Sequence, residues 1–473
     1  MSKPSESVLA AFAALLGPKG YSVDPDVMNP WLTDWRGKYC GAAAAILSPA
    51  TTEEVAAIVR LAREHGVALV PQGGNSGMVG GATPDATGEQ LLLSLRRMNR
   101  VRAIDAAGRY AIAEAGVILE HFHHAALAEG LRFPLTLGGK GSATIGGLVS
   151  TNAGGTQVLR HGTMRALVAG IEAVLPDGSI FGGLAPLKKD NRGYDLRHLL
   201  CGAEGTLGVV TAACLRLVPA ASVRRTAWIG LDSPAQALAL LRRLDTAIGS
   251  ELEGFEILPL TCLEAVLRHI PQTRAPLARD YPWHALVELA GEDAAAVDAR
   301  LEAELVAALD DGLIHDAVIA KSDRESDDFW RLRDSISEAE RAEGPAIQHD
   351  ISVPVDRMPD FIAANPLRLA GAFPGVRALS FGHLGDGNIH HHVQPPVDCD
   401  GAAWVAEHGE AVSRLVYRHV IEFGGSISAE HGIGQMKRDI LAELDSPARL
   451  AALHGVKRGL DPAGLFNPGK LIG

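Results

Sequence analysis

The chain has 473 residues, of which 47% are hydrophobic and 21% charged, and its formal net charge is −12. This length exceeds that of most single domains, so we expect two or three domains, and the composition is typical of a soluble globular protein. The negative charge, without any basic run, argues against partners such as nucleic acid or an anionic membrane surface.

Cysteines and terminal residues indicate a compartment. The five cysteines are scattered without the paired spacing of a zinc site, so we expect reduced core residues in a cytoplasmic protein. Residues 1–17 lack the basic lead and cleavage site of a signal peptide and predict a short amphipathic helix. No run approaches the ~18 apolar residues of a transmembrane span. The cysteines are Cys40, Cys201, Cys214, Cys262 and Cys399.

The first half of the chain begins with alternating strand and helix patterns. A strand begins at Ile46, and Thr51 with Glu54 has the spacing of a capping box for the helix that follows. Residues 67–70 predict a buried strand that leads into a glycine-rich stretch, Pro71–Pro84. This order is typical of an α/β nucleotide site, although the glycines lack the spacing of the common dinucleotide motif.

A second glycine-rich stretch, Gly138–Gly155, has pairs of glycines separated by small polar residues. Interior glycine costs a helix or strand about 0.5–1 kcal/mol relative to alanine, so an ordinary core element would not use this composition. Two such loops facing each other would form a cradle of backbone N–H donors for a pyrophosphate. The alternative is two flexible surface loops, but Ile145, Leu148 and Val149 indicate partial burial of the second stretch.

Further along the chain the pattern changes. Pro176–Asp177 predicts a hairpin turn, Val209–Leu217 a strand, and Pro219–Ser222 a linker at a domain boundary. From about residue 223 to residue 425, long helical patterns alternate with strand patterns, including one expected at Leu313–Ile319. We therefore predict an α+β domain here, without glycine loops of the phosphate-binding type.

A histidine-rich segment, Ser380–Val393, forms the second set of candidate functional residues. His383 and His390 flank a Gly-Asp-Gly turn, and Glu430 with His431 follows in the sequence SAEHGIG. Two histidines and one carboxylate are a common ligand set for a catalytic divalent metal with open coordination positions. Polar loop histidines are the alternative, because this spacing is not a standard zinc signature.

Strand alternation distinguishes three consecutive histidines. His390 and His392 should point to one face of a strand, and His391 to the other. If His390 binds a metal, His392 is placed to contact whatever the metal binds, whereas His391 is a solvent or packing residue.

Together these motifs resemble one family over nearly the whole chain: the FAD-dependent D-2-hydroxyacid dehydrogenases of the vanillyl-alcohol-oxidase-type FAD fold, in particular the D-2-hydroxyglutarate and D-lactate dehydrogenase branch. The resemblance implies an α+β fold with a two-lobed FAD-binding domain at residues 1–220. It also implies a substrate or cap domain with an antiparallel sheet at 221–425, and a C-terminal segment at 426–473 that returns to the flavin. The motifs are PQGGNSGMVGG (71–81), GGKGSATIGGLVSTNAGG (138–155), LRHGTMR (159–165), GYDLRHLLCGAEGTLGVVT (193–211), GHLGDGNIHHHV (382–393), AEHGIG (429–434) and FNPGK (466–470).

The resemblance also implies which residues bind FAD. Binding would be non-covalent, because the first glycine loop contains no histidine or cysteine that could tether the flavin. The implied FAD-binding residues are Pro71, Gly73, Gly74, Asn75, Ser76, Gly77, Gly80, Gly81, Gly138, Gly141, Ser142, Ile145, Gly146, Gly147, Thr151, Asn152, Gly154, Gly155, Glu204, Gly205, Val209 and Asn467.

For the chemistry, the resemblance implies a divalent metal held by His383, His390 and Glu430, with zinc the first candidate and manganese or iron the others. The reaction is oxidation of a D-2-hydroxy acid to a 2-oxo acid, in which flavin N5 takes the Cα hydride and the metal lowers the pKa of the hydroxyl. His431 is the candidate general base, and its alternative role is to orient the metal site.

Substrate choice is expected to depend on four further residues. Arg333 and Ser337 match the family residues that hold a distal carboxylate, and the alternative for Arg333 is a surface salt bridge on a helix. Gln348 stands where the D-2-hydroxyglutarate branch carries a basic residue, and His392 where it carries asparagine. D-2-hydroxyglutarate is the expected substrate, and D-lactate or another small or apolar D-2-hydroxy acid the alternative.

Partners and rival functions follow from the same residues. The expected electron acceptor is an electron-transfer flavoprotein, a quinone or a cytochrome, and the sequence leaves a homodimer open. A metal-dependent hydrolase would leave both glycine stretches without a role. A non-catalytic flavin-binding module would leave the histidine cluster without one, and an oxidase is the remaining alternative among flavoenzymes.

Overall fold

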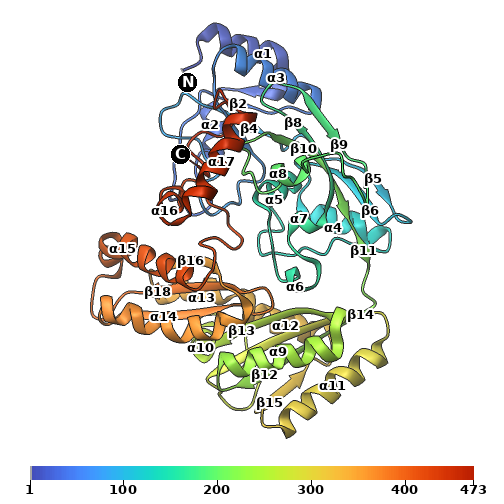
Figure 1. Cartoon of the computed structure of the whole chain (residues 1–473), viewed down its shortest axis with the longest axis vertical. Helices are drawn as coiled ribbons and strands as arrows, with labels where there is room; N and C mark the ends of the chain where they lie inside the picture. Colours follow the sequence, from blue (N-terminus) through green and yellow to red (C-terminus); the bar gives the residue numbers. More distant parts are fainter. Residues whose placement is uncertain (1–2, 473) are drawn as a thin grey trace. The chain divides into compact units, whose positions relative to one another are not determined.

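The computed structural model describes residues 3–472, which form two compact units (Figure 1). The first unit contains the chain up to Gly155, Gly162–Ala220 and the chain from Glu430 onward. The second contains Thr156–His161 and Ala221–Ala429. Helices and strands are mixed in both, as predicted for an α+β chain. The domain boundaries expected at residues 220 and 425 stay predictions.

One lobe of the first unit is a four-stranded sheet of order β1-β2-β4-β3, in which β2, β4 and β3 are parallel. Thr51 is confirmed as the N-cap of α3, because its Oγ1 accepts from Glu54 N at 3.2 Å, whereas Glu54 Oε2 accepts from Ala50 N at 2.6 Å, one residue before the position of a capping box. The strand expected at residues 67–70 begins and ends two residues later, because it pairs with β4 through Gln72. The bounds are β1 (Tyr21–Ser22), β2 (Ala45–Leu47), β3 (Leu69–Gln72) and β4 (Leu91–Ser94), with α1 (Glu6–Gly20), α2 (Pro25–Met28) and α3 (Thr52–Glu64).

The other lobe contains a five-stranded antiparallel sheet of order β5-β6-β10-β8-β9. The short strands β7 and β11 form a separate two-stranded sheet. The hairpin predicted at Pro176–Asp177 joins β8 to β9. The bounds are β5 (Val101–Asp105), β6 (Tyr110–Glu114), β7 (Leu131–Arg132), β8 (Val168–Val174), β9 (Ile180–Gly183), β10 (Val209–Arg216) and β11 (Val218–Pro219), with α4 (Leu119–Ala128), α5 (Ile145–Thr151), α7 (Met164–Leu167) and α8 (Leu196–Leu200).

The last part of the chain belongs to the first unit. It carries α16 (Arg438–Leu444) and α17 (Pro447–Leu460), the red helices beside the blue N-terminal elements in Figure 1. Leu69 of β3 donates its N–H to the Leu465 carbonyl at 2.9 Å and accepts from Asn467 N at 2.8 Å. The first lobe is therefore built from residues that are about 400 positions apart in the chain.

The second unit is organised around a seven-stranded antiparallel sheet of order β15-β12-β14-β13-β17-β18-β16. The antiparallel sheet predicted for this part of the chain is confirmed. The expected strand at 313–319 is shorter than predicted, because Leu313 N bonds back to the Ala308 carbonyl at the end of α11. The bounds are β12 (Val223–Leu231), β13 (Leu252–Pro259), β14 (Trp283–Gly291), β15 (Asp316–Ile319), β16 (Ile347–Ser352), β17 (Arg377–His383) and β18 (Asn388–Gln394).

Helices cover both faces of this sheet. In one group, α11, α9, α14 and α15 contact one another in that order and pack against the strands, whereas α10, α12 and α13 form a second group. The second group shares a hydrophobic core with Trp228, Leu258, Leu286 and Phe381, which point to one face of the sheet. The bounds are α6 (Val158–His161), α9 (Pro234–Ile248), α10 (Leu260–His269), α11 (Ala294–Asp310), α12 (Asp323–Asp334), α13 (Ile336–Glu343), α14 (Met358–Ala372) and α15 (Gly401–Glu422).

Candidate functional site

The two glycine-rich stretches contact each other in the first unit. A Cβ atom added to Gly74 would lie 1.7 Å from the carbonyl oxygen of Ser142, and one added to Gly73 would lie 2.2 Å from Thr144 Oγ1. Any side chain at these two positions would separate the loops. Glycine is therefore required by close approach, and the expectation that the two loops face each other is confirmed.

Four non-glycine residues among those expected to bind the cofactor have left-handed backbone conformations. The φ angles are 54° for Asn75, 52° for Asn152, 50° for Glu204 and 44° for Asn467. Asparagine tolerates this region, but it is uncommon for glutamate. Backbone strain of this kind tends to gather at functional sites, where the surrounding structure holds it in place.

Glu204 fixes the end of the AEHGIG motif. Its two carboxylate oxygens accept from Ile433 N and Gly434 N, each at 2.7 Å. Burial raises the pKa of Glu204, and the two N–H donors oppose that shift. Asn467 Nδ2 donates to the carbonyls of Glu204 at 2.7 Å and Gly81 at 2.9 Å. Direct contact of Glu204 with a cofactor stays a prediction.

Several buried oxygens around the glycine loops have no hydrogen-bond partner among the described residues. They are Gln72 Oε1, Thr83 Oγ1, Thr144 Oγ1 and Asn467 Oδ1. Buried polar atoms are almost always paired, so atoms left without partners indicate groups that a ligand satisfies. Thr144 also borders Gly73 in the contact between the loops. This set of two amide acceptors and two hydroxyl groups suits a large polar cofactor such as FAD.

The remaining residues expected to bind FAD lie in or beside the same loops. Pro71 is in β3, Ile145 to Thr151 form α5, and Val209 begins β10. Gly80 has a φ of 68°, and Gly77, Gly138 and Gly141 have no backbone atom within 4 Å of an added Cβ. Nearby, the pKa of the buried Lys470 is lowered to about 8 by desolvation. Its Nζ donates to the Pro468 carbonyl at 3.4 Å.

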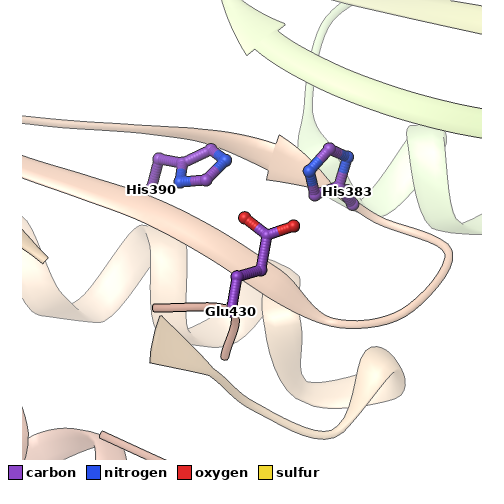
Figure 2. Close-up of side chains that lie close together, drawn as sticks. All are labelled: His383, His390 and Glu430. Atoms are coloured by element: carbon purple, nitrogen blue, oxygen red, sulfur yellow. The ribbon is translucent and has the colours of Figure 1, made fainter. Parts of the chain in front are cut away.

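The second set of residues forms a candidate metal centre (Figure 2). His383 ends β17, and His390 lies in β18 across a tight turn. Ligand atoms of His383, His390 and Glu430 lie within 4.8 Å of one another. Ligand atoms of Asp350, Glu430 and His431 are equally close to one another. The hairpin predicted to bring the two imidazoles together is confirmed.

Backbone pairing at the end of the second unit explains how the chain reaches this point. Ser352, at the end of β16, exchanges two backbone hydrogen bonds with Ser426, of 3.0 and 2.8 Å. Gly387 shapes the turn between the histidines, because its φ is 82° and an added Cβ would lie 2.2 Å from the Val353 carbonyl oxygen. Two imidazoles and a carboxylate fit a divalent ion with open positions.

Glu256 of β13 contacts two of the expected site residues at once. Its Oε1 pairs with His383 Nδ1, and its Oε2 accepts from Arg333 Nε at 2.8 Å. Burial alone would raise the pKa of Glu256, but the charges of His383 and Arg333 outweigh it and hold the pKa at about 2. Arg333 is only 8% exposed, so the alternative of a surface salt bridge is wrong.

Gln348 and His392, two of the residues expected to choose the substrate, share one face of the sheet. Gln348 pairs with His392 in the ladder between β16 and β18. The ring centroids of Phe381 and His392 lie 5.2 Å apart. The guanidinium carbon of Arg333 lies 5.4 Å from the centroid of the Phe381 ring. Ser337 is on the exposed side of α13. The roles of all four candidates in substrate binding stay predictions.

The three consecutive histidines divide as strand alternation predicts. The His390 ring packs 5.1 Å from Phe381, on the same face as His392. His391 lies on the opposite face, where its ring nitrogens bond Ser380 Oγ and Asn365 Nδ2, both at 2.8 Å. Burial lowers the pKa of His390 well below its usual value, which favours the neutral imidazole that binds metals.

Three acidic residues of this site were missed by sequence reasoning, and one of them, Asp350, lies beside Glu430 and His431. Glu256 supports His383 and Arg333, and Glu340 of α13 pairs with His392 Nδ1. A signal for Glu256 was present in the sequence: it interrupts an apolar strand, where an unpaired carboxylate would be costly. Glu340 has no comparable signal, because carboxylates are common on helices.

Two further expectations concern the chain as a whole. All five cysteines are free, and Cys201, Cys214 and Cys262 are buried as predicted. The prediction of a core position is wrong for Cys40 and Cys399, which are exposed because they lie outside the strands and helices that form the core. Within residues 3–472, none of the helices combines the length and the hydrophobicity that crossing a membrane would require.

Comparisons with known proteins add to this geometry. Residues 43–182 match the family model "FAD binding domain", and residues 220–471 match "FAD linked oxidases, C-terminal domain". The chain is 38% identical over 452 residues to D-2-hydroxyglutarate dehydrogenase of Xanthomonas citri pv. viticola, covering 95% of this chain and 93% of that one. It is 36% identical over 468 residues to the mitochondrial D-2-hydroxyglutarate dehydrogenase of Bos taurus, covering 99% and 84%.

The fold is similar to that of solved flavoenzymes. p-Cresol methylhydroxylase with bound substrate superposes with a TM-score of 0.76 at 15% identity, covering 99% of this chain and 98% of that one. At this identity the likeness concerns the fold alone. It agrees with the vanillyl-alcohol-oxidase-type architecture expected from the glycine-loop motifs.

Proposed function

Because this chain belongs to the D-2-hydroxyglutarate dehydrogenase family of FAD-linked oxidoreductases, we propose that it oxidises D-2-hydroxyglutarate to 2-oxoglutarate with the help of a divalent metal. FAD-dependent oxidation of a D-2-hydroxy acid is the activity of its family. The observation that carries the proposal is the convergence of His383, His390 and Glu430, with the buried Arg333 of α12 linked to His383 through Glu256.

Each part of the chain has a role in this proposal. When bound, FAD accepts the Cα hydride at N5 and the metal polarises the α-hydroxyl group of the substrate. Backbone N–H groups of the two glycine loops bind the pyrophosphate, and His383, His390 and Glu430 hold the metal. His431 follows Glu430 directly and takes the hydroxyl proton. Zinc is the proposed ion, with manganese and iron as its competitors.

Arg333 provides the cation for the distal carboxylate. Its planar guanidinium suits a carboxylate, and its burial strengthens the interaction because water screens it poorly. Ser337, Gln348 and His392 are proposed to add hydrogen bonds. Gln348 carries no charge, so this pocket has one cation fewer than a pocket with lysine there, which favours D-lactate or another small D-2-hydroxy acid as a second substrate.

The reduced flavin must pass its electrons on. We propose an electron-transfer flavoprotein, a quinone or a cytochrome as the acceptor. The cytoplasm as compartment and a homodimer as assembly are further parts of the proposal.

Anaerobic flavin reduction tests the proposal directly. D-2-hydroxyglutarate should bleach the flavin absorbance of the purified protein faster than L-2-hydroxyglutarate, D-lactate or D-malate at equal concentration. A chelator should abolish bleaching while FAD stays bound, and zinc should restore it. Unchanged bleaching after complete removal of the metal would refute the metal-assisted mechanism, and bleaching by none of the D-2-hydroxy acids would refute the substrate class.

A further inference from the structure

Glu256 lies between two parts of the proposed site that have different tasks. It is in the middle of β13, directly opposite His383 in the ladder between β13 and β17, and its side chain is fully buried. One oxygen pairs with the Nδ1 of His383, the candidate metal ligand, and the other accepts from the Nε of Arg333, the candidate carboxylate clamp.

The contact with His383 determines which ring nitrogen is available to a metal. Glu256 also accepts from the Arg333 guanidinium, so it meets His383 as an ionised carboxylate, which can only accept, and His383 Nδ1 carries the proton between them. Nε2 is then the nitrogen left for coordination. Metal-binding histidines are commonly oriented in this way by a carboxylate behind the ring.

The contact with Arg333 holds the guanidinium in place. Arg333 lies near the end of α12, and Glu256 lies in a central strand, so the ion pair joins a helix to the sheet. Phe381 is next to the guanidinium and to the ring of His390, so the clamp and the metal ligands pack around one aromatic ring. Arg333 cannot move relative to His383 unless one of the two contacts with Glu256 breaks.

We propose that Glu256 is the positioning residue of this site, and that its single carboxylate sets both the coordinating nitrogen of His383 and the spacing between the metal and Arg333. This inference rests on the proposed function. A dicarboxylate substrate that binds the metal with one end and Arg333 with the other must match that spacing. Glu256 therefore acts through its two partners to select the length of the substrate.

The same strand contains a matched control. Glu253 is also buried, and its Oε1 accepts from Arg160 Nη1 at 3.2 Å and pairs with His161 Nε2 at 3.0 Å. It thus forms the same kind of arginine–glutamate–histidine group, but with none of the residues proposed to bind metal or substrate. Glu253→Gln reports the cost of removing a buried carboxylate from β13 without touching the proposed site.

Metal affinity separates a positioning role from a structural one. We would measure the zinc dissociation constant of the FAD-loaded wild type, Glu256→Gln and Glu253→Gln by competition with a chromogenic chelator. Removing a carboxylate behind a metal-binding histidine typically weakens binding about 10–100-fold, and we expect this for Glu256→Gln. Glu253→Gln should stay within about twofold of the wild type, because the histidine it contacts is not a proposed ligand.

Substrate length gives a second readout. The ratio of kcat/KM for D-2-hydroxyglutarate to that for D-malate, one carbon shorter, should fall in Glu256→Gln and remain unchanged in Glu253→Gln. Glu256→Asp keeps the charge but retracts it by one methylene, so it should not restore either property. The inference would be overturned if the wild type binds zinc and Glu256→Gln, with its FAD content intact, has a zinc dissociation constant within about twofold of the wild-type value.

A measurement on the wild type covers the case in which the variants fail to fold. In ¹⁵N-histidine spectra of the zinc-loaded protein, with His383 assigned by its loss in His383→Gln, we expect a protonated Nδ1 and a coordinating Nε2. Coordination through Nδ1 would overturn the inference while leaving the metal site in place. A wild type that binds no zinc, manganese or iron would overturn the metal-assisted function and this inference with it.

Discussion

Replacing Glu204 with glutamine should loosen the loop at residues 433–434 without unfolding the first unit. In the wild type, each carboxylate oxygen accepts one backbone N–H of this loop at 2.7 Å. Glutamine has nearly the same shape but keeps only one acceptor oxygen. Its amide NH₂ group would face one of the two backbone N–H donors, and two donors cannot bond each other, so one of the two hydrogen bonds is lost.

The expected magnitude follows from those two bonds. A hydrogen bond to a charged group contributes about 1.5–3 kcal/mol, and the variant loses one of them. Burying a charged carboxylate costs free energy, which is why burial raises the pKa of Glu204. The neutral amide avoids this cost, and the gain offsets part of the loss. We therefore expect local opening to become easier by about 2 kcal/mol, which corresponds to roughly 30-fold in an equilibrium constant.

Hydrogen exchange measures this opening at the two amides concerned. In FAD-loaded protein, the amides of Ile433 and Gly434 should exchange about 30-fold faster in Glu204→Gln than in the wild type, following the same energy difference. Glu172→Gln is the matched control, because Glu172 bonds Thr52, Arg102 and Thr211 side chains in the same unit. Equal exchange at 433–434 in both variants would refute the reasoning.

Three further predictions concern substrate, metal and pH. Gln348→Lys should raise the ratio of kcat/KM for D-2-hydroxyglutarate over D-lactate by about tenfold, because a charged hydrogen bond exceeds a neutral one by roughly 1–2 kcal/mol; no change would show that residue 348 does not face the substrate. His390→Ala should lose zinc in equilibrium dialysis, whereas His391→Ala should lose mainly stability, and equal loss of zinc in both would contradict the assignment of faces. Burial lowers the pKa of Lys470 from 10.5 to about 8. Burying the charged amine therefore lowers the stability of the folded state by its full amount below pH 8, and by less as the pH rises toward 10.5. Lys470→Met should therefore raise the free energy of unfolding in urea by about 3 kcal/mol at pH 7 and about 1 at pH 10, and an increase that does not depend on pH would contradict this origin.

Features that depend on nearby residues could be predicted from the sequence. The N-cap at Thr51, the hairpin that joins His383 to His390, and the opposite facing of His391 all follow from spacings of a few residues. Helical and strand periodicities are local properties, so one sequence is enough to reveal them. The family motifs extended this to the two glycine loops, whose contact is now seen at Gly74.

Features that depend on pairing between distant strands could not be predicted in this way. Glu256 meets His383 because β13 lies beside β17, and nothing within either strand specifies that neighbour or its register. The same holds for Glu204 and the loop at 433–434, which are more than 200 residues apart. Glu340 pairs with His392 only because α13 covers that face of the sheet. Side-chain partners of this kind need the three-dimensional structure.

The hydrogen bonds of Glu204 also have a consequence for synthesis on the ribosome. The partners of Glu204 and of β3, at residues 433–434 and 465–467, are translated only after the whole of Ala221–Ala429. All seven strands of the second sheet lie within residues 223–394, so this sheet has its full set of strands while the first unit still lacks its last segment. During that interval a nascent chain exposes the Glu204 carboxylate and the backbone N–H and carbonyl of Leu69, which later bond residues 465 and 467. A chaperone or a protease can recognise such groups.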